Sequence, residues 1–155
     1  MRKVIVVLMV LVVYAGFAVA GEKARDGRFI AYDDGTVVDT QTNLMWAAKD
    51  NGRTIDWGDA GYYCEKYRGG DYTDWRMPTS DELKVLYDEG KTYKSDCGTD
   101  VHLTELIHLT CASVWTSEFD ESKVTCFNFG GGDLWRLPLV NSWPNRRVLP
   151  VRSAK

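Results

Sequence analysis

Short apolar stretches beside turn residues predict strands in the first third of the chain. Residues 28–32 and 36–39 form two such stretches on either side of Asp34-Gly35, a dipeptide typical of tight hairpin turns. An apolar segment at 44–48 follows a turn-rich stretch. We therefore expect a group of antiparallel strands here, preceded by a short flexible segment at 21–27.

Apolar residues recur at helical spacing in the middle of the chain. A first helix is expected after Asp56, a candidate N-cap, and it should end at Gly69-Gly70. A second helix is expected over 80–89 and a third, short one over 103–111. The apolar face of the first helix combines Ala60, Tyr63, Cys64 and Tyr67.

Several independent signals mark the start of the second helix. Pro78 has the backbone φ of a helix start and no N–H to lose. Thr79 can act as N-cap, and Glu82 three residues later completes a capping box. We therefore interpret the charged run from Asp74 to Leu83 as structural rather than as a catalytic or binding set.

The last third of the chain returns to strands. Stretches at 114–119, 124–129, 134–137 and 147–152 have strand character, and Pro150 indicates an edge or a strand end. Strands, then two or three helices, then further strands predict a single α+β domain with short helices packed on antiparallel strands.

The N-terminus has the features of a secretory signal peptide. Arg2 and Lys3 precede an apolar stretch at 4–17 that is short for a membrane span, and Ala18-Val19-Ala20 is typical of a cleavage site. We expect residues 1–20 to be removed on export to the periplasm or the extracellular space. The domain over 21–155 would then have no membrane attachment. An uncleaved N-terminal anchor is the alternative.

Charge and cysteine content narrow the picture further. The chain has 19 basic and 22 acidic residues, and loss of Arg2 and Lys3 changes the net charge from −3 to 17 − 22 = −5. An acidic chain with few basic runs argues against nucleic acid as a partner. Four cysteines in an exported chain favour two disulfides out of three possible pairings. We favour Cys97–Cys111, which flank one short segment, with the remaining pair Cys64–Cys126.

A zinc site is the competing interpretation of the cysteines. Cys97, His102, His108 and Cys111 are suitable ligands for tetrahedral zinc. The two histidines are six residues apart, however, which places them on different sides of a helix, and export favours oxidised thiols. We therefore expect no metal and no cofactor.

Five motifs follow one another along the chain: DGTVVDTQTNLMWA, DWRMPTSDEL, VWTSE, FNFGGG and RVLPVR. In this order they resemble the C-terminal domain family of the Legionella collagen-like adhesin, over about residues 26–152. The resemblance implies a C-type-lectin-like fold and, from the founding adhesin, binding of sulfated host polysaccharides. The chain has no Gly-X-Y repeat, so trimerisation through a collagen-like stalk is not expected. It also lacks the Trp-Asn-Asp motif of calcium-dependent lectins.

The late loop at 133–147 is the best candidate for a binding surface. Aromatic faces stack on sugar rings, and the arginine fork matches sulfate or carboxylate. The alternative is that the tryptophans are buried and the arginines pair with nearby acids. The four other tryptophans, Trp46, Trp57, Trp75 and Trp115, are expected in the core. The candidate ligand-binding residues are Trp135, Arg136, Trp143, Asn145, Arg146 and Arg147.

These patterns predict an exported, non-catalytic, disulfide-stabilised binding domain for a polysaccharide or another surface macromolecule. A structural module that binds a protein partner is the second hypothesis. An enzyme related to the formylglycine-generating sulfatase modifiers, which share part of the DWRMPTSDEL motif, is the third. The chain has no Gly-x-Ser-x-Gly elbow of a serine hydrolase. We interpret the acidic group Glu118, Asp120 and Glu121 as a solvated turn rather than as the paired carboxylates of a glycosidase.

Overall fold

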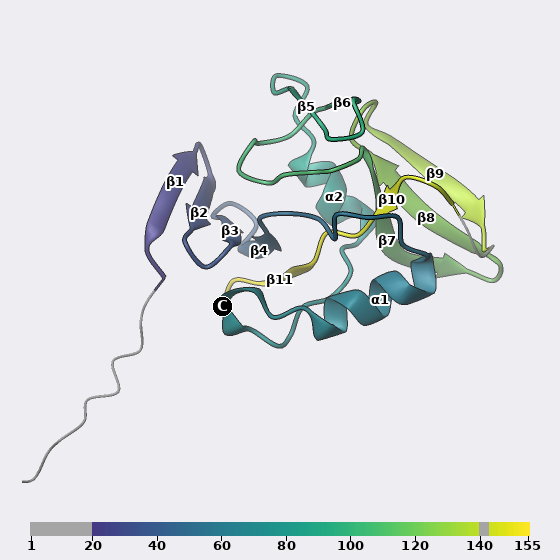
Figure 1. The fold of residues 1–155 in the computed structure, drawn as a ribbon, viewed down its shortest axis with the longest axis horizontal. Coiled ribbons are helices and arrows are strands. Elements are labelled where there is room, and N and C mark those ends of the chain that lie inside the picture. Colours follow the sequence, from purple (N-terminus) through teal and green to yellow (C-terminus); the bar gives the residue numbers. More distant parts are fainter. Residues whose placement is uncertain (1–19, 140–142) are drawn as a thin grey trace, which may run out of the picture.

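The computed structural model describes residues 20–139 and 143–155, so the expected signal peptide lies outside the described residues except for Ala20. The described elements form an α+β fold with two main sheets (Figure 1). The N-terminal sheet has the order β1-β2-β3-β4-β11, and the C-terminal sheet has the order β10-β7-β8-β9. The elements are β1 Glu22–Asp26, β2 Phe29–Tyr32, β3 Thr36–Asp39, β4 Leu44–Ala47, α1 Trp57–Lys66, the 3-10 turn η1 Gly69–Asp71, α2 Ser80–Leu86, β5 Tyr93–Lys94, β6 Asp100–Val101, β7 Ser113–Asp120, β8 Lys123–Asn128, β9 Asp133–Pro138, β10 Arg146–Arg147 and β11 Val151–Ser153.

The N-terminal sheet confirms the predicted strands and adds one. Strands β2, β3 and β4 are antiparallel neighbours, with Val37 opposite both Ala31 and Trp46. The flexible segment predicted at 21–27 is wrong, because Glu22–Asp26 forms edge strand β1 against β2. Most of its side chains are exposed, so no apolar alternation marks this strand in the sequence.

The two α-helices begin where the sequence predicts. Helix α1 follows Asp56, and α2 follows Thr79, whose hydroxyl accepts from Glu82 N at 3.2 Å while Thr79 N donates to Glu82 Oε2 at 2.9 Å. This is the predicted capping box. Helix α2 ends at Leu86 rather than near residue 89, since the backbone turns away and Asp88 N donates to the carbonyl of His102.

The third helix predicted over 103–111 is wrong. Leu103, Ile107 and Leu109 are fully buried, so the apolar residues of this segment do pack in the core. The backbone of this segment, however, finds partners in other parts of the chain: His108 N donates to the carbonyl of Ala48 at 2.8 Å. Long-range pairing has replaced the helical hydrogen bonds.

The last predicted strand, 147–152, is divided between two sheets. Arg146–Arg147 forms β10, parallel to β7, whereas Val151–Ser153 forms β11, antiparallel to β4. Pro150 lies between them, as expected for a residue that ends a strand. The chain end therefore joins the C-terminal sheet to the N-terminal sheet.

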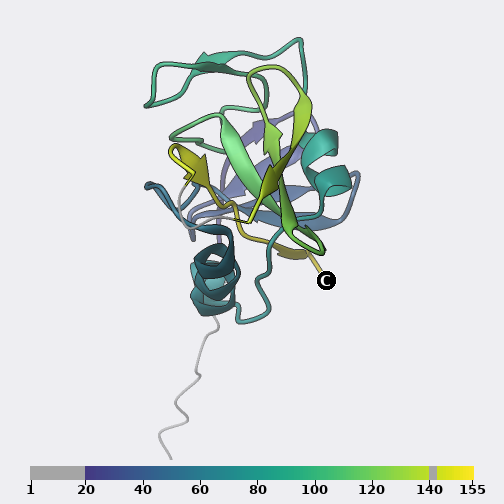
Figure 2. The same ribbon diagram turned by 90° about the vertical axis from the view of Figure 1, so that its right-hand side faces the viewer.

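The two helices cover opposite faces of the C-terminal sheet (Figure 2). Leu83 and Leu86 of α2 pack in a first hydrophobic cluster with Val114, which lies on β7. Ala60 of α1 packs in a second cluster with Trp115, the next residue of β7. Successive strand residues point to opposite faces, so the sheet separates the two clusters.

One of the two predicted disulfides is present. Cys97 and Cys111 are bonded, with their Cα atoms 5.2 Å apart. The prediction of a Cys64–Cys126 bond is wrong, because both are free, buried cysteines in the second hydrophobic cluster. Burial raises the pKa of Cys64 to about 12 and also raises the pKa of Cys126. Such thiols stay protonated and pack as small apolar side chains.

Among residues 20–139 and 143–155, the helices lack the combined length and hydropathy of a membrane-spanning segment.

Candidate functional site

Trp135 and Arg146 form the centre of the predicted binding surface. The guanidinium carbon of Arg146 lies 5.2 Å from the centroid of the Trp135 ring, within the range of a cation–π contact. Trp135 lies in β9 and is 39% exposed, and Arg146 begins β10, so residues from two strands are combined. A half-exposed indole beside a guanidinium presents an apolar face and a forked donor together.

Arg146 is held in place while part of its charge remains unmatched. Its Nη1 donates to the carbonyl of Pro144 at 3.2 Å. Its Nε is buried and lacks a hydrogen-bond partner, and none of the ion pairs found among residues 20–139 and 143–155 includes Arg146. Because none of these ion pairs ties Arg146 to a carboxylate, an anionic group of a ligand could bind its guanidinium without first displacing one, although the buried Nε itself is out of reach of a ligand.

Trp143 and Asn145 lie near this pair. Trp143 packs against the second hydrophobic cluster, and its Nε1 donates to the carbonyl of Pro138, the last residue of β9, at 3.1 Å. Asn145 is exposed, has φ 59°, and donates its backbone N–H to Thr54 Oγ1 at 3.2 Å. This left-handed conformation, which asparagine tolerates better than most residues, sets the turn that leads into Arg146.

Arg136 does not belong to the Trp135 face. In the pairing of β8 with β9, Trp135 lies opposite Cys126 and Arg136 lies opposite Thr125. Cys126 faces the second cluster, so Trp135 is on the α1 side of the sheet and Arg136 is on the other side. Arg136 is exposed but points away from Arg146.

The prediction that Arg147 binds a ligand is wrong. Arg147 is only 6% exposed. Its Nε donates to Thr110 Oγ1 at 2.6 Å, and its Nη2 donates to Cys111 Sγ at 2.9 Å. The strand geometry of β10 sends the neighbours Arg146 and Arg147 to opposite sides, one toward the surface and one into the interior.

The C-terminal sheet also exposes large apolar side chains that the sequence did not single out. Phe119 and Leu139 are each 50% exposed, and Leu134 is 38% exposed. Phe119 stacks on Trp57, with ring centroids 5.5 Å apart. Trp57 is half-buried, so its predicted place in the core is only partly correct. Trp46, Trp75 and Trp115 are buried as predicted.

Glu118 has a structural role that was also missed. It was predicted to be part of a solvated turn, but its carboxylate accepts from Ser80 N at 2.7 Å and Ser80 Oγ at 2.8 Å, at the start of α2. Burial disfavours its charged form, but hydrogen bonds from Thr116 and Ser80 outweigh this effect and lower the pKa of Glu118. Glu82 is similar: burial is outweighed by hydrogen bonds from Arg76 and Thr79, and the pKa of Glu82 is lowered.

These two carboxylates predict a loss of stability in acid. A folded-state pKa below the unfolded value means that the unfolded chain binds more protons, so the stabilisation is present above about pH 4.3 and is lost as pH falls through the folded pKa. We expect Glu82→Gln to have a smaller decrease in unfolding free energy than the wild type between about pH 5 and about pH 2. Urea unfolding at several pH values measures this; equal decreases in the two proteins would contradict it.

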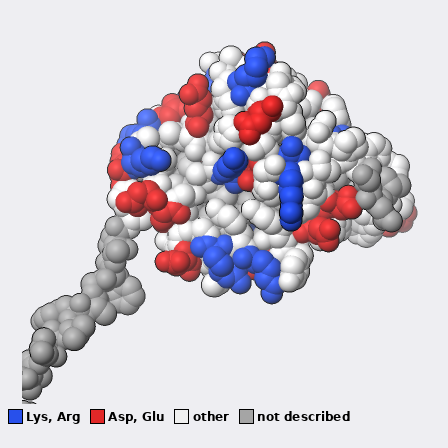
Figure 3. All heavy atoms as spheres, in the orientation of Figure 1, with Lys and Arg blue, Asp and Glu red and all other residues white. Residues whose placement is uncertain are grey.

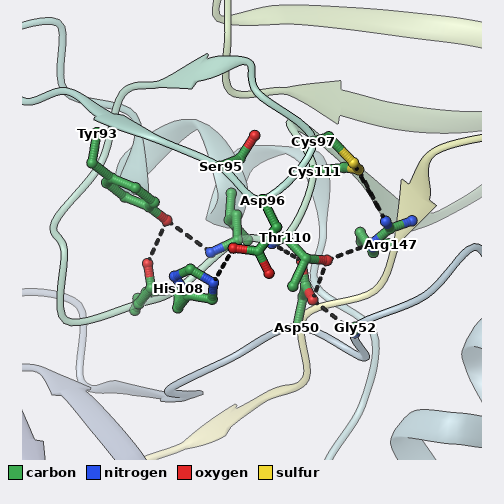
Figure 4. Close-up of polar contacts among 12 residues, drawn as sticks. Asp50, Gly52, Tyr93, Ser95, Asp96, Cys97, His108, Thr110, Cys111 and Arg147 are labelled. Atoms are coloured by element: carbon green, nitrogen blue, oxygen red, sulfur yellow. Dashed lines mark hydrogen bonds and ion pairs between the residues drawn. A yellow bond between two sulfur atoms is a disulfide. The ribbon is translucent and has the colours of Figure 1, made fainter.

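A buried polar network lies behind β10 (Figure 4). Asp50 is 5% exposed and accepts from Thr110 N at 2.6 Å, Thr110 Oγ1 at 2.9 Å and Gly52 N at 2.8 Å. Thr110 in turn accepts from Arg147. No local sequence pattern indicated this network, because it joins residues 60 and 37 positions apart.

The predicted absence of a metal site stays a prediction, but the zinc ligands considered above have other partners. Cys97 and Cys111 are bonded to each other. His108 Nε2 contacts Asp96 Oδ1 at 2.9 Å, and His102 Nδ1 contacts the carbonyl of Lys91 at 2.9 Å. Within the described residues, no group of three or more potential metal ligands is found.

Charges on the described surface are mixed rather than segregated. On the face shown in Figure 3, acidic and basic side chains lie interspersed. A hollow of about 750 Å³ between the β2–β3 turn and η1 contains Asp33, Asp34 and Asp71. Two of these carboxylates stabilise local backbone, since Asp33 accepts from Gly21 N and Asp34 from Thr36 N.

Comparison with known proteins places the chain in a family. No curated protein matches it. The model of the Lcl C-terminal domain matches residues 35–152, which include α1, α2 and most strands of both sheets together with Trp135 and Arg146. This span is most of the chain, and it agrees with the resemblance carried by the five sequence motifs. The chain belongs to the Lcl C-terminal domain family.

Proposed function

We propose that the chain is an exported, non-catalytic binding domain with a C-type-lectin-like fold, which recognises an anionic polysaccharide through Trp135 and Arg146. The fold assignment rests on the family and on the α+β arrangement. The observation that carries the binding proposal is the contact between the Trp135 ring and the Arg146 guanidinium.

The contact supplies two properties that a charged sugar requires. The exposed part of the Trp135 ring can stack on the apolar face of a pyranose. The guanidinium beside it can donate two parallel hydrogen bonds to a sulfate or carboxylate. The ring also limits the motion of Arg146, which reduces the entropy lost on binding.

The acidity of the chain sets a limit on the ligand. With a net charge of −5 after signal removal and mixed charges on the surface, long-range attraction to a dense polyanion is weak. The proposed ligand therefore carries separated anionic groups, and stacking contributes as much as charge. Apolar side chains such as Phe119 and Leu139 extend the surface on which such a chain would lie.

Retention on immobilised polysaccharides tests this proposal. We expect the protein to be retained on a column that carries sulfated or uronic-acid polysaccharide and not on neutral dextran. Trp135→Ala should weaken binding by about 2 kcal/mol, or about thirtyfold, as for a central anchor residue. Arg146→Gln should weaken it by about 1 kcal/mol, or about fivefold.

Arg25→Gln is the matched control. Arg25 is exposed, lies in β1 of the other sheet and is paired with Glu22 at 3.0 Å. Arg25→Gln changes the net charge by the same amount as Arg146→Gln. Binding by the Arg25 variant should equal that of the wild type. Equal weakening by the two arginine variants would show that only net charge matters, and the Trp135–Arg146 site would then be rejected.

A protein-binding module is the second candidate, and the apolar surface favours it. Phe119 and Leu139 are each 50% exposed and lie near the turn between β7 and β8, since Leu139 N donates to the carbonyl of Ser122 at 2.7 Å. Apolar side chains grouped at a surface are typical of contacts between proteins. Retention on none of the polysaccharides, at any salt concentration, would favour this candidate over the first.

A further inference from the structure

The two cysteines of the Cys97–Cys111 disulfide differ in their exposure to solvent. Cys97 is exposed in the loop after β5, whereas Cys111, just before β7, is 2% exposed. The backbone holds the loop in place, since Cys97 N donates to the carbonyl of Thr110 at 2.9 Å. A reagent from solution therefore reaches the sulfur of Cys97 before that of Cys111.

A buried guanidinium contacts the inner sulfur (Figure 4). Arg147 Nη2 lies 2.9 Å from Cys111 Sγ and 3.6 Å from Cys97 Sγ. Its position is fixed by the backbone pairing of β10 with β7, and Nη1 also donates to the carbonyl of Arg146 at 3.2 Å. The side chain is thus directed at Cys111 by the fold.

The charge of Arg147 is not cancelled by a direct ion pair. Among residues 20–139 and 143–155, none of the ion pairs includes Arg147. The nearest acid in its network, Asp50, is separated from it by the hydroxyl of Thr110 and already accepts from two backbone N–H groups. A positive charge in contact with sulfur favours the thiolate over both the thiol and the disulfide.

We propose that Cys97–Cys111 is a redox-active disulfide that exchanges with an external dithiol, with Cys97 as the sulfur attacked and Cys111 as the leaving thiolate stabilised by Arg147. A thiolate of the dithiol attacks Cys97 Sγ and forms a mixed disulfide. The Cys97–Cys111 bond breaks, and its electron pair leaves with Cys111 Sγ beside the guanidinium. The second thiolate of the dithiol then attacks the sulfur that the dithiol contributes to the mixed disulfide, and Cys97 leaves as a thiolate. The dithiol is oxidised to a disulfide, and the protein gains two electrons.

The first test is the redox equilibrium of the full chain in dithiothreitol buffers, read by peptide mass mapping so that Cys64 and Cys126 are not counted. Arg147→Gln should make the disulfide harder to reduce, with an equilibrium constant about tenfold lower, which corresponds to about 30 mV for a two-electron couple. Arg147→Lys keeps the charge and should lie closer to the wild type. An equilibrium constant that is the same in all three folded proteins would overturn the role of Arg147.

The second test keeps Arg147 and so does not depend on the folding of its variants. Cys111→Ser leaves Cys97 as the one thiol of the pair, and Cys97→Ser leaves Cys111; the buried thiols of Cys64 and Cys126 are present in both variants and are distinguished by peptide mass mapping. With oxidised glutathione as the probe, the mixed disulfide should form at least about tenfold faster at Cys97 than at Cys111, because only Cys97 is exposed. Faster modification of Cys111, or equal rates at both positions, would overturn the assignment of Cys97 as the sulfur attacked.

Discussion

Replacement of Asp50 by alanine is expected to destabilise the protein by about 3 kcal/mol. The carboxylate is buried and accepts the backbone N–H groups of Thr110 and Gly52 together with the Thr110 hydroxyl. The substitution leaves these donors without a partner in an interior that water does not easily reach, at a cost of about 1–3 kcal/mol for each unsatisfied group. It also removes the negative charge nearest to the buried Arg147 in this network.

Asp96→Ala is the matched control for this prediction. Asp96 also contacts a neighbouring side chain, His108, at 2.9 Å, but Asp96 is exposed and His108 is only half-buried. Loss of such a surface pair should cost less than about 1 kcal/mol. Urea unfolding of both variants gives the comparison. An unfolding free energy for Asp50→Ala within about 1 kcal/mol of the wild type would show that the network is not a main support of the fold.

Trp115→Ala is expected to cost about 3–5 kcal/mol. The side chain is 1% exposed in the second hydrophobic cluster, and its Nε1 donates to the carbonyl of Ile55 at 2.8 Å. Truncation leaves a large cavity between the C-terminal sheet and α1 and an unpaired carbonyl. Trp115→Phe should cost less, because it restores most of the apolar volume but not the hydrogen bond.

Trp135→Ala is the control for the core variant, since this tryptophan is 39% exposed. Its effect on unfolding should be below about 1 kcal/mol. The two tryptophans thus separate stability from binding: Trp115 supports the fold, and Trp135 is proposed to contact a ligand. Similar losses of stability for the two variants, measured by urea or thermal unfolding, would contradict this division.

Local signals in the sequence were sufficient for much of the fold. The hairpin turn at Asp34-Gly35 and the capping box of Thr79 and Glu82 depend on residues close together in the chain, and both are present in the structure. They were sufficient to place β2, β3 and the start of α2. The assignment to the family was also predicted from the order of short motifs.

Elements whose backbone partners are not indicated by an apolar pattern were missed or misassigned. Strand β1 has no apolar alternation and exists because β2 offers it a hydrogen-bonding edge. The segment 103–111 has helical apolar spacing, but its backbone pairs with other parts of the chain, such as Ala48. Apolar spacing alone reports burial and does not distinguish a helix from a buried loop.

The arrangement of the candidate site was predicted only in part. Trp135 and Arg146 were correctly placed together near the surface, but Arg147 was included because it is adjacent to Arg146 in the sequence. A strand assignment for these two arginines would have placed them on opposite sides. The Asp50 network had no local signal, because its partners lie in separate segments.

The central claim, binding of an anionic polysaccharide at Trp135 and Arg146, is tested most directly by the indole N–H signals of the six tryptophans in an NMR titration. With an oligosaccharide that carries one carboxylate per disaccharide, such as a hyaluronan fragment, as the ligand, the Trp135 signal should shift most and the Trp143 signal less, whereas the signals of the buried Trp46, Trp75 and Trp115 should not move. A saturating shift at Trp135 that disappears in Arg146→Gln would support the claim. No shift at Trp135, or a larger one at a tryptophan outside this surface, would contradict it.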